Sequence, residues 1–271
     1  MALTHEHHVA AGQWLVERLG PLGARVGSLV PAGYEAYARV LHPAETADGT
    51  PARWGDVAAA CGTTVHPAVQ FWRLVGAPDP WRADDGRWPG YAPRVGTLDA
   101  VTYGAVVEAL ATHRGAAAEV VAGLWEGFGW IDGGGVSVLF ASDGEPTADE
   151  LETRQRGRSV RGAFEPDVLE APRLELPHRS YLLFRGALAD VATVLDADGP
   201  WSTAGIGSWH QSPNLLWAVD GSWCLATEID LDSTVVGGPA PLIDAVLAHP
   251  DLEALPLPTD VSLAADGDTV N

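Results

Sequence analysis

The helical repeat of hydrophobic positions is clearest between residues 98 and 113, where apolar residues recur every three or four positions. Asp99 suits the first turn of such a helix, and His113 suits the last. The stretch 76–95 is rich in Pro and contains two Trp, so it predicts an ordered but irregular segment. Weaker patterns predict helices over 5–19, 54–61 and 67–74 and a strand over 34–41.

After residue 118 the apolar spacing changes to the alternation that is typical of strands. Asp220-Gly221 separates two apolar runs and predicts a hairpin turn, and the glycines at 133–135 predict another. The charged, sparsely apolar stretch 142–168 predicts a mobile surface loop. The expected strands are 119–130, 136–140, 174–176, 181–184, 214–219 and 223–235, and the expected helices are 188–195 and 241–249.

This order of elements predicts an α+β fold with a mixed, mainly antiparallel sheet that helices cover on one side. Three parts are expected along the chain. Residues 1–95 form a mainly helical part, and residues 96–257 form an α+β part that includes the mobile loop at about 142–168. Residues 258–271 form an acidic tail, which we expect to be frayed.

The composition is that of a folded protein, with 46% hydrophobic residues and eleven Trp among 271 residues. No apolar run reaches the roughly 18 residues that a membrane span needs. The N-terminus lacks the basic and apolar regions of a secretory signal, so we expect a cytoplasmic protein with no membrane partner. Cys61 and Cys224 are far apart in sequence and form neither a redox pair nor a cysteine zinc motif.

All sixteen basic residues are Arg, because the chain has no Lys. This excludes Schiff-base chemistry on lysine and the lysine of a phosphate-binding loop. The net charge of −20 disfavours binding to nucleic acid, whose phosphates would be repelled. Residues 186–271 contain thirteen acids and no Arg, so a cationic partner or a metal would be drawn to this part of the chain.

Three of these acids, Glu228, Asp230 and Asp232, fall at alternate positions. In an extended strand they would share one face, where like charges repel unless water, a cation, an Arg or a basic partner compensates them. Carboxylate oxygens suit Mg²⁺ or Ca²⁺, which makes the three acids candidate metal ligands. The alternative is a solvated or partner-facing strand edge, since charged edges also prevent aggregation.

Tryptophan supplies a second candidate site. Trp125 and Trp130 flank Glu126 in a Gly-rich aromatic segment, and Trp217 and Trp223 flank the expected hairpin turn. Together they could line an apolar pocket in which Glu126 is a buried acid, although large aromatic side chains more often fill a core. His178 and Arg179 lie between two expected strands and are candidates for binding an anion or for catalysis; the alternative is a partly exposed turn whose side chains hydrogen-bond to local carbonyls.

Several motifs stand out as a set: Leu124–Trp130, Leu176–Gly186, Ser212–Trp217 and Ser222–Gly238. They resemble an uncharacterised family of stand-alone proteins from GC-rich bacteria, and the resemblance covers roughly residues 34–256. It implies no catalytic assignment, because no activity is established for that family. The acidic α/β character, with a Gly-Gly turn before a short helix, is also similar to small bacterial immunity-type proteins.

Two hypotheses of function follow. The first is a cytosolic binding or inhibitor-type protein whose acidic C-terminal surface engages a basic protein partner. The second is an enzyme or small-molecule-binding protein with a Trp-lined pocket and a site built from Glu126, His178, Arg179 and the acids, with Mg²⁺ or Ca²⁺ as a possible cofactor.

Overall fold

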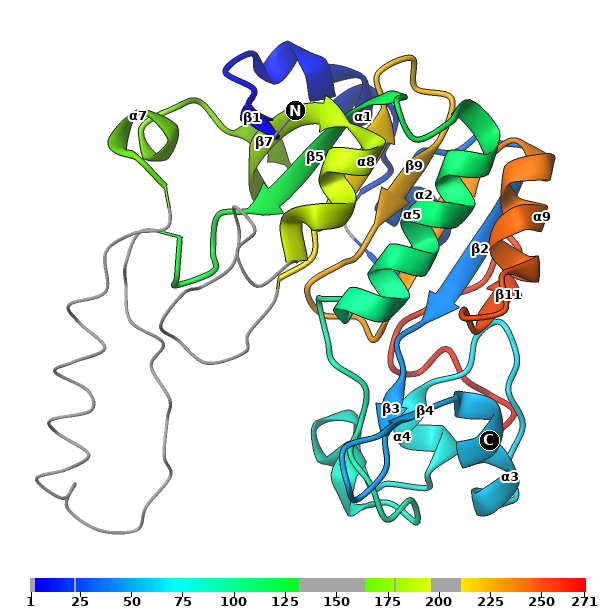
Figure 1. Ribbon diagram of the computed structural model, residues 1–271. Coiled ribbons are helices and arrows are strands. Elements are labelled where there is room, and N and C mark those ends of the chain that lie inside the picture. Colours follow the sequence, from blue (N-terminus) through cyan, green and yellow to red (C-terminus); the bar gives the residue numbers. More distant parts are fainter. Residues whose placement is uncertain (1–2, 22, 132–163, 178, 196–210) are drawn as a thin grey trace, which may run out of the picture.

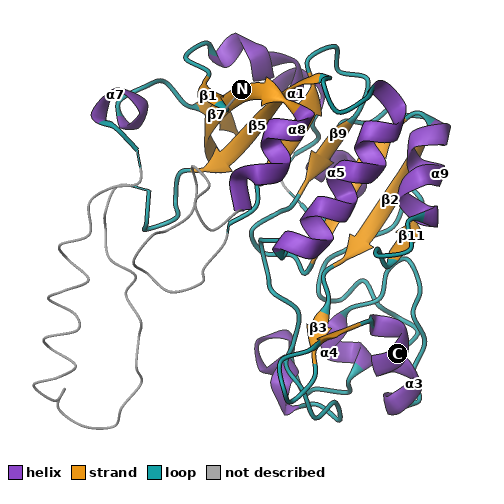
Figure 2. Cartoon of the chain, in the orientation of Figure 1, coloured by secondary structure: helices purple, strands orange, loops and turns teal. Residues whose placement is uncertain are grey.

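The described residues form a nine-stranded sheet in which all pairings are antiparallel. The computed structural model describes residues 3–21, 23–131, 164–177, 179–195 and 211–271. The strands lie in the order β1 (Thr4–His5), β7 (Arg179–Ala187), β5 (Glu119–Trp125), β8 (Leu215–Ala218), β9 (Cys224–Ala226), β10 (Ser233–Gly238), β2 (Ala36–Leu41) and β11 (Ala254–Pro256), with β6 (Leu174–Leu176) paired to β7. Helices pack on this sheet (Figure 2), so the predicted α+β fold is confirmed.

Helices cover both faces of the sheet rather than one, and this corrects the prediction (Figure 1). One face packs against α5 (Ala100–Arg114), α8 (Leu188–Ala192) and α9 (Ala240–Ala248), and a short 3₁₀ turn, η3 (Thr193–Leu195), continues α8. The other face packs against α1 (Gln13–Arg18) and α2 (Val26–Leu29). Along β5, Val120 joins the first core and Val121 the second, as the alternation of side chains in a strand requires.

A smaller lobe, residues 44–95, lies beyond one end of the sheet and has a hydrophobic cluster of its own. Its elements are β3 (Ala44–Glu45), β4 (Pro51–Ala52), α3 (Trp54–Cys61), α4 (Phe71–Leu74) and the 3₁₀ helix η2 (Pro80–Asp85). Residues 1–95 also supply β1 and β2 to the large sheet, so the predicted boundary at residue 95 does not divide the sheet. We call residues 44–95 the small lobe.

The most regular sequence patterns gave the correct elements. The helix predicted over 98–113 is α5, where the Asp99 side chain accepts hydrogen bonds from the backbone N–H groups of Val101 and Thr102 at 3.0 Å. The hairpin predicted at Asp220-Gly221 joins β8 to β9, and Gly221 adopts the positive φ of 68° that favours glycine there. The helices predicted over 54–61, 188–195 and 241–249 are also present.

Two of the predicted elements differ from those in the structure. The helix predicted over 5–19 is replaced by β1, the 3₁₀ helix η1 (Val9–Gly12) and the short α1, because Thr4 and His5 pair with β7. The strand predicted over 119–130 ends at Trp125, after which Glu126 and Gly127 turn. The strand predicted over 136–140 and most of the loop predicted over 142–168 lie outside the described residues, while α7 (Pro166–Leu169) lies near that loop's end.

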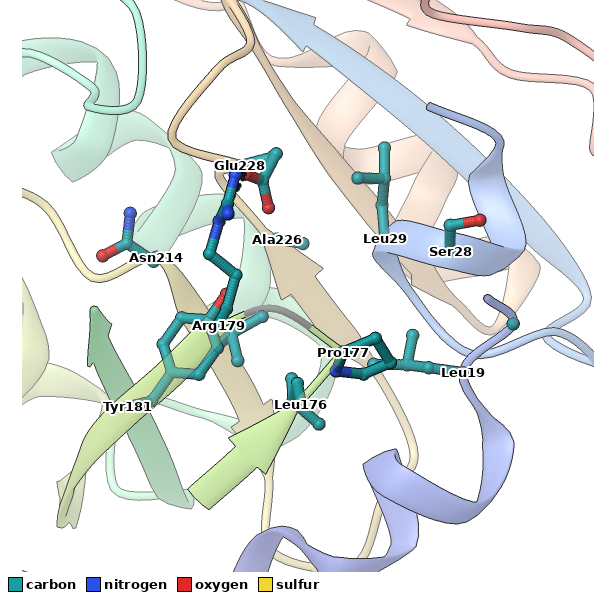
Figure 3. Close-up of a pocket in the computed structure, with 12 residues that line it drawn as sticks. Leu19, Ser28, Leu29, Leu176, Pro177, Arg179, Tyr181, Asn214, Ala226 and Glu228 are labelled. Carbon is teal, nitrogen blue, oxygen red and sulfur yellow. Dashed lines mark hydrogen bonds and ion pairs between the residues drawn. The ribbon is translucent and has the colours of Figure 1, made fainter. Parts of the chain in front are cut away.

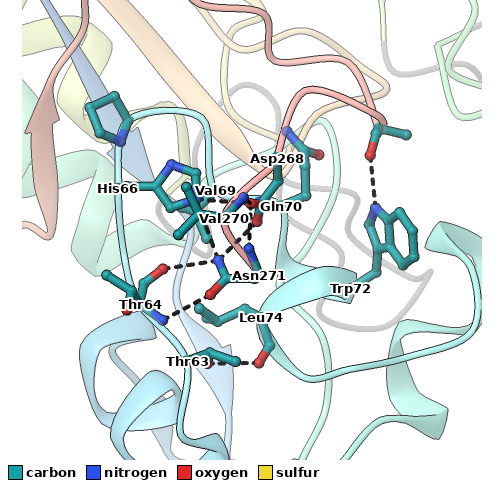
Figure 4. A network of polar contacts seen from close by, with 12 residues as sticks. Thr63, Thr64, His66, Val69, Gln70, Trp72, Leu74, Asp268, Val270 and Asn271 are labelled. Carbon is teal, nitrogen blue, oxygen red and sulfur yellow. Dashed lines mark hydrogen bonds and ion pairs between the residues drawn. The ribbon is translucent and has the colours of Figure 1, made fainter.

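The C-terminal residues 258–271, which we call the C-terminal strap, are ordered rather than frayed. Leu263 is fully buried, and its N–H donates to the carbonyl of Ala24 at 2.7 Å. Further along, the buried carboxylate of Asp268 contacts His66 at 2.9 Å and accepts hydrogen bonds from Gln70 and Asn271 (Figure 4). Contacts with residues distant in sequence therefore order a segment whose own pattern predicts no element.

Candidate functional site

The prediction that three acids share one face of a strand is wrong, because residues 227–232 form a turn and are not part of a strand. β9 and β10 pair antiparallel, with Ala226 opposite Val235, so the chain must reverse between them. The turn contains a hydrogen bond from Leu231 N–H to the Glu228 carbonyl at 3.0 Å. Gly96, at a positive φ of 75°, donates to the Leu231 carbonyl at 2.9 Å and fixes the turn from outside.

Glu228 and Asp230 converge on Arg179 at the start of β7. The Arg179 guanidinium contacts Glu228 Oε1 through Nε at 3.2 Å and through Nη2 at 3.1 Å, and Asp230 Oδ2 through Nη2 at 2.8 Å. It lies over the Trp125 ring at 5.9 Å from the centroid. The structure thus brings together four of the residues singled out in the sequence, as one ion-pair cluster.

A small cavity lies beside this cluster, between the sheet and α2 (Figure 3). Arg179 and Glu228 line it on one side, and Ser28 and Leu29 line it from α2. Its volume is about 30 Å³, which is the space of about one water molecule. Burial raises the pKa of the neighbouring Tyr181 hydroxyl. The cavity is therefore too small for a substrate, and the cluster beside it is a structural ion pair.

Asp232 pairs with a different arginine. Arg39 of β2 is completely buried, and its Nη2 lies 3.4 Å from Asp232 Oδ1. The same guanidinium donates to Ser233 Oγ at 2.8 Å and to the Val69 carbonyl at 2.6 Å, and it lies 5.7 Å from the ring centroid of Trp54. Burial raises the pKa of the Asp232 carboxyl, and the charge of Arg39 opposes this. Internal guanidinium groups thus compensate all three acids, so they do not form a free row.

The remaining acid and histidine candidates do not join these pairs. Glu126 binds Arg173 at 3.1 Å, and 43% of the Glu126 side chain is exposed. Trp130 stacks on Phe128, with ring centroids 6.4 Å apart. His178 lies outside the described residues. Among the described residues, no group of three or more His, Cys, Asp or Glu side chains is arranged to hold a metal ion, and binding of Mg²⁺ or Ca²⁺ stays a prediction.

Trp217 and Trp223 are both fully buried and belong to the cores on opposite faces of the sheet. Trp217 lies opposite Cys224 in the β8–β9 pair, and residue 223 precedes Cys224, so its side chain points to the other face. These two residues fill cores, which is the alternative role considered for them in the sequence. They do not line one pocket with Trp125 and Trp130 as predicted.

A larger groove lies between the small lobe, the 227–232 turn and the C-terminal strap, and the sequence patterns did not reveal it. We call it the Trp81 groove; its volume is about 360 Å³. The residues that line it are Gln70, Phe71, Trp72, Pro80, Trp81, Ala83, Ala92, Pro93, Val95, Asp230, Leu231, Asp232, Leu263, Ala264 and Ala265. Three segments that are distant in sequence therefore build this groove.

The Trp81 groove has an aromatic wall that is open to solvent. Trp81 is 94% exposed, and Val95, from the same Pro-rich segment, is 54% exposed. The Asp79 carboxylate accepts a hydrogen bond from Trp81 N–H at 3.0 Å, and Pro80 occupies the first turn of η2. A Trp within a Pro-rich stretch without apolar periodicity was the one signal of this wall in the sequence.

The opposite wall is fixed by the strap. Trp72 Nε1–H donates to the Ala265 carbonyl at 3.2 Å (Figure 4). Gln70 Nε2–H donates to the Leu263 carbonyl at 3.0 Å. Asp230 and Asp232 come from the turn. The Asp230 side chain is 73% exposed although Arg179 contacts its Oδ2 atom, so it offers carboxylate surface to a second cation.

Comparison of the chain with protein-family models, with curated proteins and with solved structures found no match. Within the described part of the chain, no helix has both the length and the apolar character needed to cross a bilayer. The site is therefore interpreted from its own geometry and charge.

Proposed function

We propose that this protein is a cytosolic binding or inhibitor-type protein that engages a basic protein partner, and that the partner's basic segment docks in the Trp81 groove. The observation that carries the proposal is the solvent-exposed indole of Trp81 on the wall of a groove that also contains the exposed carboxylate of Asp230. Exposed Trp residues and apolar patches beside charged groups are typical of protein-binding surfaces.

The charge of the whole chain supports a basic partner over an acidic one. At a net charge of −20, long-range attraction speeds the encounter with a cationic protein and slows the encounter with nucleic acid. The groove's volume of about 360 Å³ accommodates a few side chains of a partner segment. The competing enzyme hypothesis has less support, because its Trp residues lie in separate cores and its acids are paired with arginines.

The test is fluorescence anisotropy with a labelled peptide mixture rich in Arg, Lys and Leu, compared with a mixture in which Asp and Glu replace the basic residues. We expect binding of the basic mixture alone, weakened at high salt because screening reduces the attraction between exposed charges. Trp81→Ala and Asp230→Asn should each weaken binding by about tenfold, the effect of losing a central contact.

Matched variants control for unspecific effects. Val101→Ala removes an exposed apolar side chain on α5, and Asp244→Asn removes an exposed acid on α9; neither residue lines the groove. Both should bind like the unaltered protein. The proposed docking site would be contradicted if the groove and control variants lost the same amount of affinity. It would also be contradicted if the affinity for the basic mixture did not change with salt concentration.

A further inference from the structure

We infer that the side chain that enters the Trp81 groove is an arginine, with its guanidinium stacked on the Trp81 indole and paired with the carboxylate of Asp230. The inference rests on the proposed function and specifies its ligand. The two recognising groups line the same groove, and both are largely exposed, at 94% for Trp81 and 73% for the Asp230 side chain.

The fold already uses this combination of groups internally. Arg179 lies over the ring of Trp125 and pairs with Asp230 at 2.8 Å. Arg39 lies over the ring of Trp54 and pairs with Asp232. In each case one guanidinium contacts an indole face and a carboxylate from the same 227–232 turn. The groove itself has two indoles. Arg73 lies over the Trp72 ring at 4.3 Å from the centroid, whereas among the described residues no arginine is stacked on Trp81.

The chemistry of the groove favours arginine over lysine. A guanidinium is planar and weakly hydrated, so it can stack on an indole while its N–H groups pair with a carboxylate. The ammonium of lysine is a strongly hydrated point charge that gains less from an aromatic face. Apolar groove residues, Val95, Leu231 and Leu263, can pack against the aliphatic stem of an arginine.

The position of Trp81 also reduces the cost of binding. Pro80 restricts the backbone before the indole, and Asp79 accepts the Trp81 N–H at 3.0 Å. Little backbone freedom is therefore lost when a ligand covers the ring. Arg179 also pairs with Glu228 at 3.1 Å, so it keeps a carboxylate partner of its own when a second guanidinium shares Asp230.

The experiment uses the full chain and three dye-labelled, blocked peptides of Gly and Ser that carry a central Leu-X-Leu, with X as Arg, Lys or citrulline. Fluorescence anisotropy gives each Kd. We expect the Lys peptide to bind at least about fivefold more weakly than the Arg peptide. The uncharged citrulline peptide should bind at least about tenfold more weakly than the Arg peptide. Trp81→Leu keeps an apolar side chain without the aromatic face and should abolish the preference for Arg over Lys, whereas Trp81→Phe should retain part of it.

The outcomes separate the inference from the function on which it rests. The arginine assignment is overturned if the Arg and Lys peptides bind with equal affinity, or if Trp81→Leu keeps the preference for Arg. In either case the proposed salt-sensitive docking of basic peptides is unaffected. If neither the three peptides nor the basic peptide mixture binds, the arginine assignment and the proposed function are both overturned. Circular dichroism of each variant shows that it is folded, and Val101→Ala, which removes an exposed apolar side chain that does not line the groove, serves as the control.

Discussion

Arginine provides the charge balance of this protein residue by residue. The chain has no Lys, and two arginines from distant strands compensate the three acids of the 227–232 turn. Arg39 shows what full burial of such a group requires, because its Nε, Nη1 and Nη2 atoms all have oxygen partners. Removing one partner would leave a buried charge uncompensated, which is far more costly than never burying the pair.

His42 is a second buried polar residue, and it makes stability depend on pH. Its Nδ1 contacts the Arg94 carbonyl at 2.7 Å, and its Nε2 contacts Thr234 Oγ1 at 3.0 Å. Burial lowers the pKa of His42 from 6.5 to about 4, and the nearby charge of Arg39 acts in the same direction. The folded protein therefore holds this imidazole neutral at a pH where the unfolded chain protonates it.

We predict that His42 reduces the free energy of unfolding as the pH falls from about 6.5 to about 4, and that its contribution changes little above or below that window. The loss from this residue is about 3 kcal/mol. Urea unfolding across this pH range measures it. His42→Asn should be less stable at neutral pH but should flatten this part of the profile, whereas His8→Gln, at an exposed position, leaves the buried imidazole in place and should keep the steep part of the profile. A His42→Asn profile as steep as that of the unaltered protein would contradict the prediction.

At the scale of elements, local patterns predicted those parts whose stability is mainly local. The α5 helix has a regular apolar repeat and an N-cap at Asp99, and the β8–β9 hairpin has the turn residues Asp220-Gly221. The 227–232 turn was mistaken for a strand because its acids and apolar residues alternate by chance with the period of a strand. Only the pairing of β9 with β10 shows that the chain must reverse there.

The C-terminal strap illustrates an element held by distant polar contacts. Burial acts to raise the pKa of the Asp268 carboxyl, but hydrogen bonds from Asn271, Val270 and Gln70 outweigh it and lower the pKa to about 2. Its charged form is therefore favoured by folding, and this contribution is present at neutral pH and is lost only as the pH falls from about 4 to about 2.

We predict that Asp268→Asn lowers the free energy of unfolding at neutral pH by about 2 kcal/mol, because it removes a charged acceptor from several hydrogen bonds. Urea unfolding measures the change. Asp266→Asn, which neutralises an exposed acid two residues earlier in the strap, is the matched control and should change stability by less than about 0.5 kcal/mol. Equal effects of the two substitutions would show that general charge, and not the buried network, stabilises the strap.

At the scale of the whole molecule, the candidate site depends on how distant segments meet. The sequence was sufficient to single out Trp125, Arg179, Glu228 and Asp230, and the fold brings these four together. It was not sufficient to reveal the Trp81 groove, whose walls come from the small lobe, the 227–232 turn and the strap. No local period links these segments, so their proximity follows only from the packing of the small lobe and the strap against the end of the sheet.

The net charge of −20 acts on the whole fold as well as on its partners. Folding brings these negative charges closer together, so self-repulsion opposes the compact state and screening by salt should relieve it. We predict that Tm rises by a few degrees between about 0.01 M and about 0.15 M sodium chloride, over which the Debye length falls from about 30 Å to about 8 Å. Differential scanning calorimetry measures the shift.

The exposed acids on and near α9 provide the control for this whole-molecule effect. Asp244 and Asp251 are exposed, and substituting both with Asn should make the rise of Tm with salt smaller without altering either arginine cluster. Ion pairs respond to salt in the opposite direction, because screening weakens the attraction between Arg179 and its two acids. A Tm that falls with salt would therefore mean that attraction within the Arg39 and Arg179 clusters outweighs the repulsion among the unpaired acids, even at this net charge.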